Sequence, residues 1–141
     1  MHTNERRESG KETRPDLSRL TDDVQLRIAV VEQMGAVWGR DARRLWYLLA
    51  PAGDHLAVYA EGEVSFLPRC PDPLNDPAVW GVLMEREMDG WKTGTRGGVV
   101  FHVCRWETRN GWAYKEGPRA ATLGRAACLA FLAKNGVASQ A

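Results

Sequence analysis

Apolar residues recur at helical spacing in three segments of the chain, and each segment carries capping residues. In the first segment, Val24, Ile28 and Val31 lie on one face of a helix. Thr21-Asp22-Asp23 supplies residue types that favour a helix N-terminus, and Gly35 stands at the usual C-terminal stop. The pattern therefore predicts a first helix from about residue 22 to residue 34.

The second and third helices are recognised by their ends and by their composition. Asp76 as N-cap and Pro77 as first helical residue predict a second helix. A third is predicted from about residue 122 to Lys134, and its only charged residues are Arg125 and Lys134. A helix that is apolar all round is buried or meets a partner, so we also expect a homodimer formed through this helix.

Short runs that are apolar or alternate between apolar and polar residues predict five strands. Three of them lie at residues 45–49, 55–60 and 63–67, with Glu61-Gly62 as the turn between the last two. A helix extending from Arg40 is the alternative for the first of these segments. A longer strand at 99–107 is followed by Asn110-Gly111, the strongest hairpin signal in the chain. Residues 68–77, which hold four prolines, and residues 92–98, which hold three glycines, are predicted to be loops.

A two-residue turn at Asn110-Gly111 fixes a register for the hairpin. It places Arg109 opposite Trp112, Trp106 opposite Lys115, and Arg105 opposite Glu116. One sheet face then holds Phe101, Val103, Trp112 and Tyr114, and the other holds Val100, His102, Cys104, Trp106 and Ala113. Both faces are half apolar, which leaves a sheet covered on both sides as an open alternative.

These elements predict an α+β fold in which three helices pack on antiparallel strands in a layered sandwich, in the order α-β-β-β-α-β-β-α. Residues 1–20 are polar and mixed in charge, which predicts a disordered tail. Residues 21–141 are of a length that suits a single domain.

Charge and cysteine content narrow the classes of partner. The 19 Lys and Arg residues nearly balance the 18 Asp and Glu residues, so no basic field spans the chain and nucleic acid is not the expected partner. Cys70, Cys104 and Cys128 are odd in number and far apart, which favours a reducing compartment over a disulfide framework. No run is apolar enough to cross a membrane, so a cytoplasmic protein is expected.

One His/Cys cluster, formed by His102 and Cys104, is the candidate for catalytic or metal-binding chemistry. His102 and Cys104 fall on one face of a strand, but a metal site needs two more ligands and a nucleophilic site needs an orienting acid. A half-buried His beside a core Cys is the simpler reading. We therefore predict no catalytic residues, no metal and no cofactor, and keep a cryptic enzyme using His102 and Cys104 as the last alternative.

Arginine and tryptophan gather in the C-terminal half, where they suggest a binding surface. Such pairs suit cation–π contacts, stacking and protein hot spots. The predicted binding residues are Trp91, Arg96, Arg105, Trp106, Arg109 and Trp112. The Gly- and Thr-rich loop at 92–98 also offers backbone N–H groups to a phosphate, which leaves a nucleotide as an alternative ligand.

Three segments of the sequence resemble the phage ABA-sandwich domain, a family of small bacteriophage proteins of unknown function. They are Leu26–Gly35, Asn75–Glu87 and Thr122–Ala130, and the resemblance covers about residues 22–136. The family has a Tyr-Ser-Thr-Asp-like motif before its middle helix. In this chain Leu74-Asn75-Asp76 stands roughly at that place, so the motif is degenerate here. The resemblance implies a phage or prophage accessory protein and supplies no catalytic residues.

Together these observations predict a non-enzymatic accessory protein that binds a host protein, with a bacterial defence system as the candidate target. A protein that sequesters a nucleotide signal is the alternative.

Overall fold

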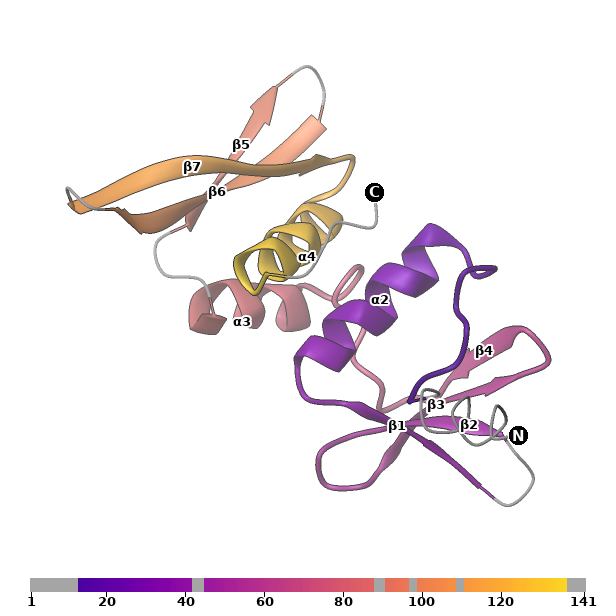
Figure 1. The fold of residues 1–141 in the computed structure, drawn as a ribbon. Coiled ribbons are helices and arrows are strands. Elements are labelled where there is room, and N and C mark those ends of the chain that lie inside the picture. The colour runs from indigo at the N-terminus through magenta and orange to yellow at the C-terminus, as the bar shows by residue number, and fades with distance from the viewer. Residues whose placement is uncertain (1–12, 42–44, 88–90, 97–98, 109–110, 137–141) are drawn as a thin grey trace, which may run out of the picture. The chain divides into compact units, whose positions relative to one another are not determined.

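The computed structural model describes residues 13–41, 45–87, 91–96, 99–108 and 111–136 (Figure 1). Their contacts divide the chain into two compact units. Unit 1 comprises residues 1–21 and 34–70, and unit 2 comprises residues 22–33 and 71–141. The first helix groups with the C-terminal half rather than with its neighbours in sequence, and the single domain expected for residues 21–141 stays a prediction.

Unit 1 is a four-stranded antiparallel meander in the order β1-β2-β3-β4. The strands are β1 (Val37–Arg40), β2 (Trp46–Leu49), β3 (His55–Ala60) and β4 (Glu63–Phe66). Leu48 and Ala57 lie opposite each other on β2 and β3, and both are fully buried. Glu61 and Gly62 join β3 to β4 with positive φ at both residues, which confirms the predicted turn.

Residues 13–20 depart from the predicted disordered tail. Pro15 and Leu17 are buried, and the Tyr59 hydroxyl on β3 donates a 2.9 Å hydrogen bond to the Asp16 carbonyl. The Ser18 backbone N–H donates to the Asp16 carboxylate at 3.0 Å, which lowers the pKa of Asp16. Two apolar side chains and these hydrogen bonds anchor a stretch whose composition alone indicated disorder.

Unit 2 has three layers, with one helix in the middle. The helices are α2 (Asp22–Gln33), α3 (Pro77–Glu87) and α4 (Leu123–Lys134), and the antiparallel strands β5 (Trp91–Arg96), β6 (Val99–Thr108) and β7 (Gly111–Ala120) form a sheet in that order. Helix α4 packs against β6 and β7, and both α2 and α3 pack against α4 (Figure 1).

The central place of α4 explains its composition. Every residue from Ala126 to Leu132 is buried, and the core cluster joins them to Leu26 and Val30 of α2 and to Leu83 and Met84 of α3. The predicted burial of this helix is confirmed. Its own chain covers the apolar surface that suggested a homodimer, so that argument for a dimer no longer holds.

The α+β class and the three helices are confirmed, but the order contains two more strands than predicted. Strand β1 was missed because it has four residues, one of them Gly39, and too little pattern to recognise. Strand β5 occupies most of the predicted loop at 92–98, of which residues 97–98 lie outside the described residues. Its Lys-Thr-Gly-Thr sequence lacks apolar alternation, and pairing with β6 holds it in the sheet.

Candidate functional site

The register of β5, β6 and β7 places the predicted binding residues. Trp106 pairs with Ala113 and Arg105 with Tyr114, so the hairpin is shifted by two residues from the prediction. The ladder ends with the pair Thr108–Gly111. Arg109 lies outside the described residues. A shift of two preserves the alternation of a strand, so the predicted grouping of positions by face is retained.

Ala120 identifies the face of the sheet that meets α4. It is 8% exposed, belongs to the same core cluster as α4, and pairs with Val100. Its neighbour Arg119, which pairs with Phe101, is exposed. Because successive positions of a strand alternate between faces, Val100 and every second residue after it lie on the α4 side of β6.

The alternation of β6 continues without interruption because the irregularity of this ladder is on β7. Between the pairs Phe101–Arg119 and Val103–Glu116, one residue of β6 faces two residues of β7, Gly117 and Pro118. This is a β-bulge, and glycine and proline are the residues expected in one because proline donates no ladder hydrogen bond.

The side of the sheet that faces away from α4 is here named the outer face. The helix that packs against β6 and β7 is α4, on the opposite side of the sheet. The strand pairs of β5, β6 and β7 show which positions belong to the outer face. These positions are Lys92, Gly94, Arg96, Val99, Phe101, Val103, Arg105, Glu107, Trp112, Tyr114, Glu116 and Arg119.

This arrangement separates the predicted binding residues into two groups. Arg96, Arg105 and Trp112 lie on the outer face. Trp91, which pairs with Cys104, and Trp106 lie on the α4 side. The six residues therefore do not form one patch.

The outer-face residues are also spread along the sheet. Arg96 pairs with Val99 at one end, and Arg105 and Trp112 lie towards the other. Val99 and Arg105 are six residue steps apart on β6, which corresponds to roughly 20 Å. Sequence reasoning missed Lys92 and Arg119, which the register adds to the same face; neither belongs to an Arg–Trp pair in sequence.

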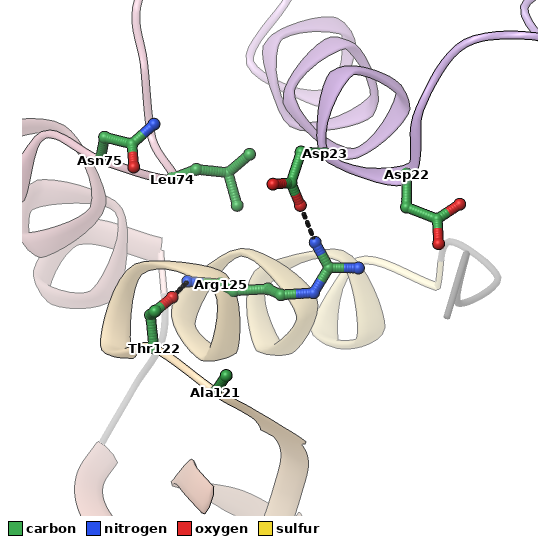
Figure 2. A pocket seen from close by; sticks show the side chains of 7 residues that line it. All are labelled: Asp22, Asp23, Leu74, Asn75, Ala121, Thr122 and Arg125. Carbon is green, nitrogen blue, oxygen red and sulfur yellow. Dashed lines mark hydrogen bonds and ion pairs between the residues drawn. The ribbon is translucent and has the colours of Figure 1, made fainter.

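A pocket of about 400 Å³ opens at the start of α4 (Figure 2). It is lined by Asp22, Asp23, Leu74, Asn75, Ala121, Thr122 and Arg125. Arg125 forms an ion pair with Asp23, and its backbone N–H donates to the Thr122 hydroxyl at 3.2 Å. This ion pair links the first turns of α2 and α4 and neutralises one of the two carboxylates of the pocket.

The described cysteines are placed for packing rather than for reaction. Cys70 and Cys128 are both buried. Burial, with a smaller contribution from the charge of Asp72, raises the pKa of the Cys128 thiol to about 12, so it remains protonated near neutral pH. His102 and Cys104 occupy alternate positions of β6 on the α4 side, as predicted.

Unit 1 carries an aromatic cluster on strands β1, β2 and β3. Trp38 and Trp46 meet edge to face with ring centroids 6.4 Å apart, and the Arg40 guanidinium lies 4.7 Å from the Trp46 ring centre. Both tryptophans are only half-buried. On β2 and β3, Tyr47 stacks on the exposed His55 at 4.6 Å, and its hydroxyl donates to Asp41 at 3.0 Å.

Metal-binding groups and membrane-spanning helices are both absent from the described part of the chain. Its His, Cys, Asp and Glu residues include no group of three that would hold a metal ion. None of its helices combines the length and apolar character needed to span a bilayer.

Comparison with known proteins adds no further identification. No family model, curated protein or solved structure matches this chain, and the resemblance to the phage ABA-sandwich family stays a prediction from the sequence.

Proposed function

We propose that this chain is a non-enzymatic accessory protein of a bacteriophage or prophage, that it binds a host protein in the host cytoplasm, and that a component of a bacterial defence system is its target. The binding surface of the proposal is the outer face of the β5-β6-β7 sheet.

The observation that carries this proposal is the assignment of the two sheet faces. One face is joined to the core of unit 2 through Ala120 and α4, and the opposite face holds Arg105 and Trp112 at neighbouring positions. Arginine and tryptophan are enriched among the residues that dominate protein–protein binding energy. Helix α4 packs on the opposite side of this sheet, and the proposal takes the outer face as the side that a protein partner contacts.

The alternative function, nucleotide binding, was suggested by a predicted loop at residues 92–98, and residues 92–96 belong to strand β5 in the structure. The Gly- and Thr-rich segment is paired with β6 from Trp91 to Arg96, so its backbone N–H groups are not arranged as a loop around a phosphate. No other observation favours this function over protein binding.

Affinity capture from bacterial lysate tests the proposal. The wild-type protein is expected to retain a stoichiometric host protein, and Arg105→Glu with Trp112→Ala is expected to lose it. Arg69→Glu is the matched control, because Arg69 lies in unit 1 and forms an exposed ion pair of little energetic weight. Equal capture by all three proteins, or no capture by the wild type, would exclude the outer face as a binding surface.

A further inference from the structure

Unit 1 has a pocket of about 580 Å³ between the first residue of β3 and the segment that follows β4. It is lined by His55, Leu67, Pro68 and Arg69. Its volume falls within the roughly 300–1,000 Å³ that is usual for small-molecule sites. Leu67 and Pro68 are apolar, and His55 and Arg69 carry hydrogen-bond donors. The lining therefore combines an apolar surface with two polar groups, which is the usual composition of a ligand site.

Backbone hydrogen bonds hold the segment after β4 beside β3. The Leu67 N–H donates to the Leu56 carbonyl at 2.9 Å, which continues the contact of the two strands beyond the last pair of their ladder. The Cys70 N–H donates to the Leu67 carbonyl at 2.9 Å and closes a turn over the two residues between them. Cys70 is itself buried, so both ends of the turn are anchored.

Side-chain contacts orient the two polar groups of the pocket. The His55 imidazole stacks on Tyr47, whose hydroxyl is held by Asp41. Within the described part of the chain, no residue forms a hydrogen bond with the ring nitrogens of His55. The Arg69 guanidinium lies 3.1 Å from the Asp54 carboxylate, and both side chains are more than half exposed. An exposed pair of this kind is weak, so an anionic ligand can take its place at little cost.

We infer that this pocket binds a small organic carboxylate. The apolar body of the ligand would lie on Leu67 and Pro68, and its carboxylate would accept hydrogen bonds from Arg69 and His55. The planar guanidinium of arginine matches a carboxylate, to which it donates two parallel hydrogen bonds. This site belongs to unit 1 and the outer face belongs to unit 2, so the inference goes beyond the proposed function.

The charge and the size of the pocket favour this ligand over two others. The Asp54 carboxylate stays close to Arg69, and it repels a phosphate ester, with a charge of about −1.5 to −2 near neutral pH, more strongly than a carboxylate. The described lining consists of four residues, whereas a protein interface has roughly 20–30 on each side. A small monoanion therefore fits better than a phosphate ester or a protein surface.

Titration of the isotope-labelled full chain with benzoate, followed by NMR, tests this inference. Saturable shifts are expected at the backbone amides of His55, Leu67 and Arg69. Benzamide has the same ring without the charge, and it is expected to bind at least about tenfold more weakly, because hydrogen bonds to a charged acceptor are the stronger ones. Phenyl phosphate is expected to bind more weakly than benzoate because of Asp54.

A pair of arginine variants supplies the matched control. Arg69→Gln removes the charge in the pocket and is expected to weaken benzoate by roughly tenfold or more. Arg19→Gln removes an exposed arginine of unit 1 that does not line the pocket, and it is expected to bind benzoate as the wild type does. Neither arginine is buried, so both variants are expected to fold.

The inference is overturned if benzoate produces no saturable shift, if benzamide binds as well as benzoate, or if Arg69→Gln keeps the wild-type affinity. Tighter binding of phenyl phosphate would also overturn it, because the pocket would then suit phosphate esters. Arg69→Glu separates the two proposals. It should lose benzoate and still capture the host protein through the outer face, so either proposal can fail while the other holds.

Discussion

The carbonyl oxygen of Leu74 occupies the space in which any residue other than glycine at position 124 would place its Cβ. Gly124 is buried in the first turn of α4, and the segment that leads into α3 crosses it there. The contact involves backbone on both sides, so neither residue can move a flexible side chain out of the way.

Gly124→Ala is therefore expected to lower the free energy of unfolding by about 1–3 kcal/mol, the range typical of an overpacked core. The matched control is Gly81→Ala in α3, where an added Cβ meets nothing within 4 Å. Because alanine is the better helix former, that change is expected to add up to about 1 kcal/mol. Urea unfolding of both variants checks the pair, and effects of the same sign would contradict the close approach of Leu74.

Removing the cap of α4 is expected to cost about 1 kcal/mol. Thr122→Ala deletes the hydroxyl that accepts a hydrogen bond from the Arg125 backbone N–H, and no acidic residue in the first turn substitutes for it. Thr122→Ser keeps the acceptor oxygen and is expected to stay within a few tenths of a kcal/mol of the wild type. If urea unfolding shows serine to be as harmful as alanine, the methyl group rather than the cap is what matters.

Alkaline pH is expected to destabilise the fold through Cys128. Its pKa is about 12 in the folded chain against an ordinary value of 9.0. Folding therefore favours the protonated thiol, so its contribution is fully present below pH 9 and is lost as the pH rises towards 12. The loss is about 1.4 kcal/mol per pH unit within that window.

Comparison with Cys128→Ala isolates this effect from the other groups that titrate at high pH. Unfolding free energies measured between pH 8 and pH 11 should fall less steeply for the variant than for the wild type. Parallel curves would show that the thiol titrates normally. In the native wild type, the same thiol should react slowly with a thiol reagent at pH 8.

Cysteine labelling tests the assignment of the sheet faces on which the proposals depend. In a Cys104→Ala background, Val103→Cys should react readily with a thiol reagent because Val103 lies on the outer face. Val100→Cys should be protected, because its partner Ala120 is buried against the α4 side. Fast labelling at position 100 and slow labelling at 103 would reverse the two faces and remove the binding surface.

The helices could be predicted from the sequence because their signals are local. The N-terminal signals at Thr21-Asp22-Asp23 and Asp76-Pro77 and the Gly stop at Gly35 each act within one turn, and all three helices lie where they were predicted. The burial of α4 followed from its lack of charge. The sequence did not indicate which elements bury α4, because α2, which contributes Leu26 and Val30, precedes α4 by almost a hundred residues.

The sheet of unit 2 was harder to predict because its signals are not local. Asn110-Gly111 is a strong turn sequence, but cross-strand pairs along the whole length of β6 and β7 set the register. The last of these pairs joins Thr108 to Gly111, so Gly111 belongs to β7 rather than to the turn. The face of each candidate residue depended on one distant fact, the burial of Ala120. Without it, Trp106 and Arg105 were equally good candidates for the binding surface.

The assignment of α2 to unit 2 has a consequence for how this chain can be divided. The chain passes from one unit to the other after residues 21, 33 and 70, so no single cut yields both units intact. A fragment starting at residue 71 lacks Leu26 and Val30 from its core, and the complementary fragment carries α2 without α4 to cover it. A break anywhere between residues 34 and 70 separates α2 from α4 and leaves neither product with a complete unit 2, so the two segments that build this unit are expected to diverge together.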